Sequence, residues 1–122
     1  MIYGSVSEER RPTIELQLLG PLGDLIIPAT VDTGFNGWLK VTPDTVRALG
    51  LPARMPTLGQ LANGERIVFD RCEVTVLWDG QLQPVRALVG DGQHLVGTRL
   101  LSGYELSVHF APGGSVTITA AR

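Results

Sequence analysis

Short apolar runs separated by turn residues extend through the whole chain, and this pattern constrains the fold more than any other feature. Fifteen glycines and eight prolines punctuate the 122 residues. Segment 13–20, "TIELQLLG", alternates apolar and polar residues, which is typical of a strand with one buried face. Segments 66–78, 104–110 and 115–120 are also rich in strand-forming residues. The sequence therefore predicts an all-β fold, organised as a single domain over residues 1–122.

Two Asx-Gly pairs predict β-hairpins. Asp79-Gly80 follows a long strand pattern. Asn63-Gly64 has strand-like residues on both sides. Both pairs suit tight turns, because Asp, Asn and Gly tolerate the left-handed backbone that such turns need. Pro84 lies in the next strand pattern and predicts a sheet edge or a bulge, since proline has no N–H to donate.

Local signals also predict two short helices. Thr42 can cap the first helix, Pro43 suits its first turn and Gly50 suits its end. Residues 98–103, "TRLLSG", can form one or two helical turns. The polar segment 5–12, by contrast, is expected to form a loose loop between a terminal strand and the body of the fold.

Charge and cysteine content exclude several classes of protein. The formal net charge is -2 and the isoelectric point is about 5.6, and no basic cluster marks a nucleic-acid interface. Cys72 is the one cysteine, so an internal disulfide is impossible and nothing indicates an oxidising compartment. No apolar run approaches the roughly 18 residues of a membrane span, and the first residues lack the pattern of a signal peptide. We therefore expect a cytoplasmic protein without nucleic-acid or membrane partners.

The stretch "IPATVDTGFNGWL", residues 27–39, follows an apolar strand pattern with a carboxylate, Asp32. Burying a charge is costly unless something binds it or uses it. Taken alone, Asp32-Thr33-Gly34 is typical of an ordinary turn, since Asp and Gly are common turn residues. The same residues also suit hydrolysis, because a carboxylate can activate water, a hydroxyl can serve as a hydrogen-bond anchor and glycine lets a second backbone approach.

One carboxylate does not make an aspartic protease. That mechanism needs two carboxylates that share a proton, so that one accepts a proton from water while the other polarises the carbonyl group. The chain contains one Asp-Thr-Gly triplet. The second Asp32 must then come from another copy of the chain across a two-fold axis, or the chemistry is absent.

Motifs in a fixed order resemble those of the retropepsin-like (clan AA) aspartic proteases. They are "VDTGFNGWL", a hairpin containing "ANGE", and "LVGTRLLSGYELSVHF" followed by "GGSVTI". The match spans residues 12–120 and resembles above all the small single-domain bacterial branch of the clan. The resemblance implies a closed β-barrel with a flap hairpin and one or two short helices, and a homodimer whose chain termini pair in its interface. It also implies an endopeptidase that hydrolyses peptide or protein substrates without a cofactor or a metal.

The resemblance assigns roles to residues of this chain. Asp32 would be catalytic, and Thr33 and Gly34 would support it. Substrate contacts would come from the turn after the triplet and from the tip of the flap: Phe35, Asn36, Gly37, Leu61, Ala62, Asn63 and Gly64.

Three further segments have roles that the resemblance implies. Residues 57–67 would form the flap. Residues 95–97, "LVG", would pack behind the active-site turn, and residues 98–102 would form the short C-terminal helix.

The turn after the triplet departs from the retroviral pattern. Phe35 stands where a small residue is usual, and Asn36 and Thr98 replace an acid and an arginine that commonly pair. Losing both partners leaves no lone buried charge, so the fold can tolerate the change. Two alternatives to the endopeptidase follow: a catalytically inactive retropepsin-fold module that binds peptides or mediates dimerisation, and a plain β-barrel with a chance triplet.

The other ionisable side chains are expected to be structural. His94 and His109 lack further ligands near them in the sequence, so we expect no metal site. Asp70, Asp79 and Asp91 are expected to be surface or turn acids rather than a second catalytic group.

Overall fold

The computed structural model describes residues 1–52, 55–60, 63–64 and 66–121. Two short helices accompany the strands: α1 (Pro43–Leu49) and α2 (Thr98–Leu101). The strands are β1 (Ile2–Val6), β2 (Pro12–Gly20), β3 (Gly23–Val31), β4 (Leu39–Val41), β5 (Met55–Gln60), β6 (Arg66–Trp78), β7 (Gln81–Val89), β8 (Leu95–Val96), β9 (Tyr104–Val108) and β10 (Ser115–Ala120).

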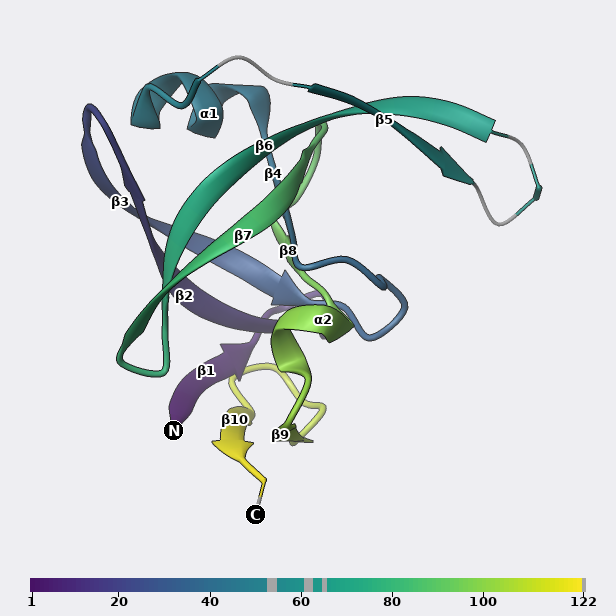
Figure 1. Cartoon of the computed structure of the whole chain (residues 1–122). Coiled ribbons are helices and arrows are strands. Elements are labelled where there is room, and N and C mark those ends of the chain that lie inside the picture. The colour runs from purple at the N-terminus through teal and green to yellow at the C-terminus, as the bar shows by residue number, and fades with distance from the viewer. Residues whose placement is uncertain (53–54, 61–62, 65, 122) are drawn as a thin grey trace.

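Six of these strands close into a β-barrel (Figure 1). Their order around the barrel is β2, β3, β8, β4, β7 and β6, and β6 pairs with β2 to complete the ring. Most neighbours are antiparallel, but β3 with β8 and β4 with β7 are parallel. The short strand β8 thus lies between the end of β3 and the start of β4. The closed barrel confirms the predicted all-β fold.

Strand β2 has two different neighbours along one edge. Residues 12–14 pair with β1, whereas residues 17–19 pair with β6. The sheet continues from β1 to β10 and then to β9. Ile2 lies opposite Ile118 in the antiparallel β1–β10 pair. The terminal strands therefore pair within one copy of the chain, whereas the sequence resemblance implies such pairing in a dimer interface.

The barrel interior is filled by apolar residues that alternate along the strands. On β2 the buried positions are Ile14, Leu16 and Leu18, as the alternating pattern predicted. Val116 and Ile118 on β10 are fully buried and extend this core beneath the terminal sheet. Burial of this apolar surface is the main force that holds the barrel closed.

The predicted hairpin at Asp79-Gly80 is confirmed. Both residues have positive φ angles, 49° and 82°, and Trp78 pairs directly with Gln81 across the two-residue turn. Pro84 lies in the first part of β7, where β6 is the neighbour, because β4 pairs only with residues 87–89. Pro84 therefore occupies a sheet edge, one of the two predicted outcomes.

Strand β5 and the first part of β6 form a two-stranded arm that extends away from the barrel (Figure 1). The last described pair before the tip joins Gln60 to Arg66. Asn63 and Gly64 are exposed at the tip, and Gly64 has a φ of 88° that favours glycine. The sequence had predicted a hairpin here, and β5–β6 is that hairpin.

Helix α1 has both of the caps that the sequence predicted. The Thr42 hydroxyl accepts a bond from Thr45 N–H at 3.3 Å, and Pro43 occupies the first turn. Gly50 ends the helix with a φ of 67°, and its N–H donates to the Arg47 carbonyl at 3.1 Å. Neither described helix is long and apolar enough to cross a membrane.

The segment between β1 and β2 is not the loose loop that its polar composition suggested. Ser7 N–H donates to the Arg11 carbonyl at 2.9 Å, and Arg10 N–H donates to the Ser7 carbonyl at 2.9 Å. Arg11 N–H also donates to the Ser7 hydroxyl at 3.1 Å. Arg10 has a φ of 62°, which lets the chain turn tightly. Hydrogen bonds rather than apolar contacts order this loop.

Candidate active site

Asp32 follows directly after the end of β3, and its backbone is held on both sides. Its N–H donates to the Val96 carbonyl of β8 at 2.9 Å. Its own carbonyl accepts from Phe35 N–H at 3.1 Å, which closes the turn that contains the triplet. The position of Asp32 is therefore set by the barrel and not only by local turn geometry.

The Asp32 carboxylate has one protein partner among the described residues. Its Oδ1 accepts from Gly34 N–H at 2.9 Å, and the residue is half-buried. Thr33 and Gly34 are exposed. The bond to Gly34 orients the carboxylate, while its second oxygen remains available to a water molecule or to another carboxyl group.

Residues 95–98 form hydrogen bonds with the turn that follows Asp32. Gly97 N–H donates to the Trp38 carbonyl at 3.1 Å, and Thr98 N–H donates to the Phe35 carbonyl at 2.8 Å. Val96 and Gly97 are buried. These contacts match the predicted position of residues 95–97 behind the active-site turn.

Two glycines make room for the ring of Phe35. A Cβ on Gly37 would lie 2.5 Å from the ring carbon Cζ, and a Cβ on Gly97 would lie 2.8 Å from the ring carbon Cδ2. Gly97 also lies so close to the Gly37 carbonyl oxygen that its Cβ would be 2.1 Å away. The half-buried ring therefore packs against the loop that carries it and against Gly97.

The remaining predicted substrate contacts lie in two places. Asn36 is exposed in the turn after the triplet. Asn63 and Gly64 are exposed at the tip of the arm. Leu61 and Ala62 lie outside the described residues.

A surface pocket of about 300 Å³ adjoins Asp32. Its lining includes Asp32 and Thr33 of the triplet and Leu95 of β8. Three of its other lining residues, Arg11, Gln93 and the exposed Phe110, were not predicted from the sequence. These residues lie far apart along the chain, so no local motif joins them.

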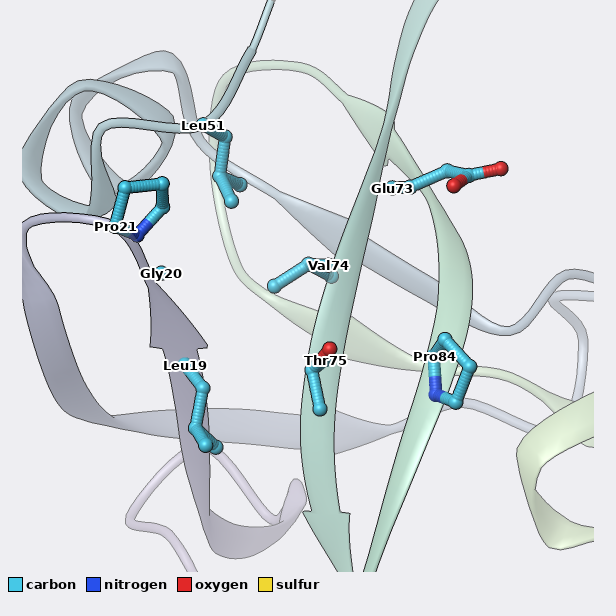
Figure 2. Close-up of a pocket in the computed structure, with 8 residues that line it drawn as sticks. All are labelled: Leu19, Gly20, Pro21, Leu51, Glu73, Val74, Thr75 and Pro84. Atoms are coloured by element: carbon cyan, nitrogen blue, oxygen red, sulfur yellow. The ribbon is translucent and has the colours of Figure 1, made fainter.

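A different pocket, of about 380 Å³, lies where β2 and β6 diverge (Figure 2). Leu19, Leu51 and Val74 give it an apolar lining. Glu73 is the one ionisable residue in that lining, and its side chain points to the opposite side of β6 from Val74 (Figure 2). Among the described residues, no second ionisable group lines this pocket.

His94 has a structural position. Its Nε2 lies 2.8 Å from the Thr45 hydroxyl, which connects the residue before β8 to α1. Burial lowers the pKa of His94, a backbone hydrogen bond to Pro28 opposes that shift, and the charge of Lys40 lowers the pKa further. In the described part of the chain, no three His, Cys, Asp or Glu side chains gather as a metal site would require.

Comparison with known proteins identifies the fold. No protein-family model matches the chain, and no curated protein matches it. Among solved structures, the EIAV protease complexed with the inhibitor HBY-793 is 21% identical with a TM-score of 0.62, and the match covers 77% of this chain and 88% of that one. A retropepsin-like aspartic protease from Rickettsia conorii is 16% identical with a TM-score of 0.60, and the match covers 99% of this chain and 91% of that one. The chain has a retropepsin-like fold, as its motifs predicted.

Proposed function

We propose that this protein is an aspartic endopeptidase that acts as a homodimer. The observation that carries the proposal is the Asp32 carboxylate, which follows β3 of a retropepsin-like fold, beside a pocket. One of its oxygens accepts from Gly34 N–H, and the other is available for chemistry. Both solved structures described above are proteases, and one of them holds an inhibitor.

In the proposed reaction, Asp32 carboxyl groups from two copies share one proton. The ionised group removes a proton from a water molecule, and the water oxygen attacks the carbonyl carbon of the peptide bond. The protonated group donates a hydrogen bond to the carbonyl oxygen and stabilises the charge that develops there. The tetrahedral intermediate then breaks its C–N bond as a proton passes to the leaving nitrogen. Throughout, no covalent bond forms between enzyme and substrate.

The exposed face of the turn suits contact with a second copy. Thr33 is exposed, and its hydroxyl has no hydrogen-bond partner within the described part of the chain. A two-fold axis beside Thr33 and Gly34 would bring two Asp32 carboxylates together. Because β1 and β10 pair within one copy, β9 forms the edge at that end of the sheet, and a second copy could extend the sheet there.

We assign the role of flap to the arm formed by β5 and β6. An extended peptide lying between the arm and the Asp32 turn could pair its backbone with exposed strand edges. The contacts proposed for the peptide are those of Phe35, Asn36 and Gly37 on the turn, and those of residues 61–64 on the arm. Orientation of the scissile bond in this way would supply a large part of the rate enhancement.

Mixing two kinds of chain tests whether one site needs two copies. Wild-type chain is dissociated, mixed with an equal amount of Asp32→Asn chain and allowed to reassociate, and cleavage of a peptide library is followed by mass spectrometry. If both carboxylates are required, about half of the wild-type chains enter mixed, inactive dimers, and activity falls by about half. Asp79→Asn chain, mixed in the same way, should instead add activity of its own. Activity that does not respond to added Asp32→Asn chain would show that each copy works alone.

The packing of Phe35 also fits one alternative, a peptide-binding module without catalysis. The ring braces the turn against Gly97, and such bracing would serve a binding surface equally well. A confirmed dimer that binds library peptides but cleaves none between about pH 3 and pH 7, where one dyad carboxyl should be protonated and the other ionised, would establish this module instead.

A further inference from the structure

The pocket beside Asp32 shares part of its lining with a second pocket. The second pocket has a volume of about 220 Å³ and is lined by residues that include Ser7 and His94. Arg11, Thr30 and Gln93 line both pockets. These three side chains therefore form a polar wall shared by the two pockets, whereas Leu95, Leu106 and Phe110 line the pocket beside Asp32 but not the second one.

Arg11 is held at this wall by its backbone. Its N–H donates to the Ser7 hydroxyl at 3.1 Å, and its carbonyl accepts from Ser7 N–H at 2.9 Å and from the Thr13 hydroxyl at 3.2 Å. The guanidinium group makes no ion pair with a described carboxylate. Arg11 therefore presents several N–H donors on a backbone that is already ordered, which reduces the entropy lost when a ligand binds.

Gln93 adds further donors to the wall. Its Oε1 accepts from the Thr30 hydroxyl at 3.0 Å. This bond orients the side-chain amide and leaves its NH₂ group without a partner among the described residues. Two donor groups, one of them charged, thus line the same cavity.

We infer that this polar wall, centred on Arg11 and Gln93, binds a carboxylate side chain of the substrate next to the scissile bond. The inference rests on the proposed function, because it places the wall in the substrate cleft. A glutamate has an aliphatic stem that suits Leu95 and a carboxylate that suits the two donors. Glu9 lines the neighbouring pocket but not the one beside Asp32.

Matched peptides test the inference. Three peptides differ only in one residue beside the scissile bond, which is Glu, Gln or Leu, and kcat/KM is measured for each. Wild-type protein should cleave the Glu peptide about 10- to 100-fold better than the Leu peptide, as expected for hydrogen bonds to a charged group. The preference for Glu over Gln should grow between about pH 3.5 and pH 6, as the glutamate ionises.

Two arginine variants separate binding from a structural role. Arg11→Gln should lower kcat/KM for the Glu peptide about tenfold or more and change that for the Leu peptide little. Arg10→Gln is the matched control, because Arg10 is exposed in the same loop but lines neither pocket. An equal loss on all three peptides with Arg11→Gln, or a wild-type preference for Leu, would overturn the inference.

Binding measurements keep this inference distinct from the proposed function. The same peptides are titrated into the Asp32→Asn protein, with and without Arg11→Gln, and their dissociation constants are compared. A Glu preference in binding that depends on Arg11, together with a wild-type protein that cleaves none of the peptides, would overturn the endopeptidase and leave the glutamate-binding pocket standing. Cleavage by wild-type protein without any Glu preference would overturn the pocket and leave the endopeptidase standing.

Discussion

Two aspartates follow the ends of two strands, and their surroundings differ. Asp32 follows β3 and Asp79 follows β6, and each has a glycine within the next two residues. Both oxygens of Asp79 have partners: Oδ1 accepts from the Met1 ammonium at 2.6 Å, and Oδ2 accepts from the Tyr104 hydroxyl at 3.3 Å. The Asp32 carboxylate has one backbone partner among the described residues. Similar local sequence thus gives one carboxylate that joins distant strands and one that is left available.

The difference shows that tertiary partners decide what a turn aspartate does. The hydrogen bond and the charge of the Met1 ammonium lower the pKa of Asp79, against a smaller opposing effect of burial. Tyr104, whose pKa is raised first by burial and then by Asp79, completes that cluster. A carboxylate with such partners has a structural role, whereas a carboxylate beside a pocket can act on a ligand.

The largest expected effect is the contrast between Asp32→Asn and Asp79→Asn in activity. Asp32→Asn removes the group that accepts a proton from water, so kcat/KM should fall by about 10³-fold or more. Asp79→Asn should retain nearly all of the activity. Kinetics on one library-derived peptide, with thermal unfolding of each variant as a folding check, measure both. Equal losses of kcat/KM in the two variants would show that the two aspartates do not differ in their roles.

The framework of the Asp32 turn should be sensitive to a single methyl group. Gly97→Ala places a Cβ 2.1 Å from the Gly37 carbonyl oxygen, and the neighbouring backbone has little freedom to move. We expect the free energy of unfolding to fall by about 3 kcal/mol. Gly90→Ala is the control, because its Cβ would lie 3.3 Å from the flexible end of Lys40. Urea unfolding measures both, and a similar small change in the two variants would show that the turn is not braced from behind.

Much of this fold could be predicted because its signals are local. The caps of α1 at Thr42 and Gly50 and the turn at Asp79-Gly80 each depend on a few consecutive residues, and each was confirmed. The closed barrel followed from motifs in order along the chain. The ordered loop of residues 7–11 was missed, because hydrogen bonds to Ser7 leave no apolar pattern in the sequence.

The site was less predictable because its contacts join distant segments. Asp32 was identified from its strand and triplet, and its catalytic role stays a prediction. The packing of the Phe35 ring depends on Gly97, sixty-two residues later in the sequence. The polar wall joins Arg11 to Gln93 in the same way. No local sequence pattern links the two residues of either pair, so neither pairing could be predicted before the topology was known.

Two glycine substitutions should affect different properties, one the stability and the other the activity, and so sharpen the comparison between the two aspartate turns. Gly80 has a φ of 82° and open space around it, so Gly80→Ala should cost about 1–2 kcal/mol of stability through backbone strain and leave activity unchanged. A Cβ on Gly34 would lie 3.2 Å from the Asp32 oxygen Oδ1. Gly34→Ala should therefore lower kcat about tenfold by displacing the carboxylate, with little loss of stability. Thermal unfolding measures the stability of both variants, and kinetics measure their activity. Similar losses of both properties in the two variants would refute the expected contrast.

The smallest expected effect is the pH dependence that Asp79 adds to stability. Its pKa in the folded chain is lowered from the ordinary value of 3.8, so the unfolded chain binds the proton more tightly. The stabilisation is therefore complete above the unfolded pKa of 3.8 and is lost as the pH falls through the lower folded value. The difference in Tm between wild type and Asp79→Asn should be constant at neutral pH and should close as the pH falls below 3.8. Acetylation of the Met1 amine should reduce this difference, because it removes the ammonium group, whose hydrogen bond to Asp79 is the main cause of the shift. A difference that widens toward acidic pH would show that Asp79 is not bound by the ammonium, and that the two aspartate turns are more alike than their hydrogen bonds indicate.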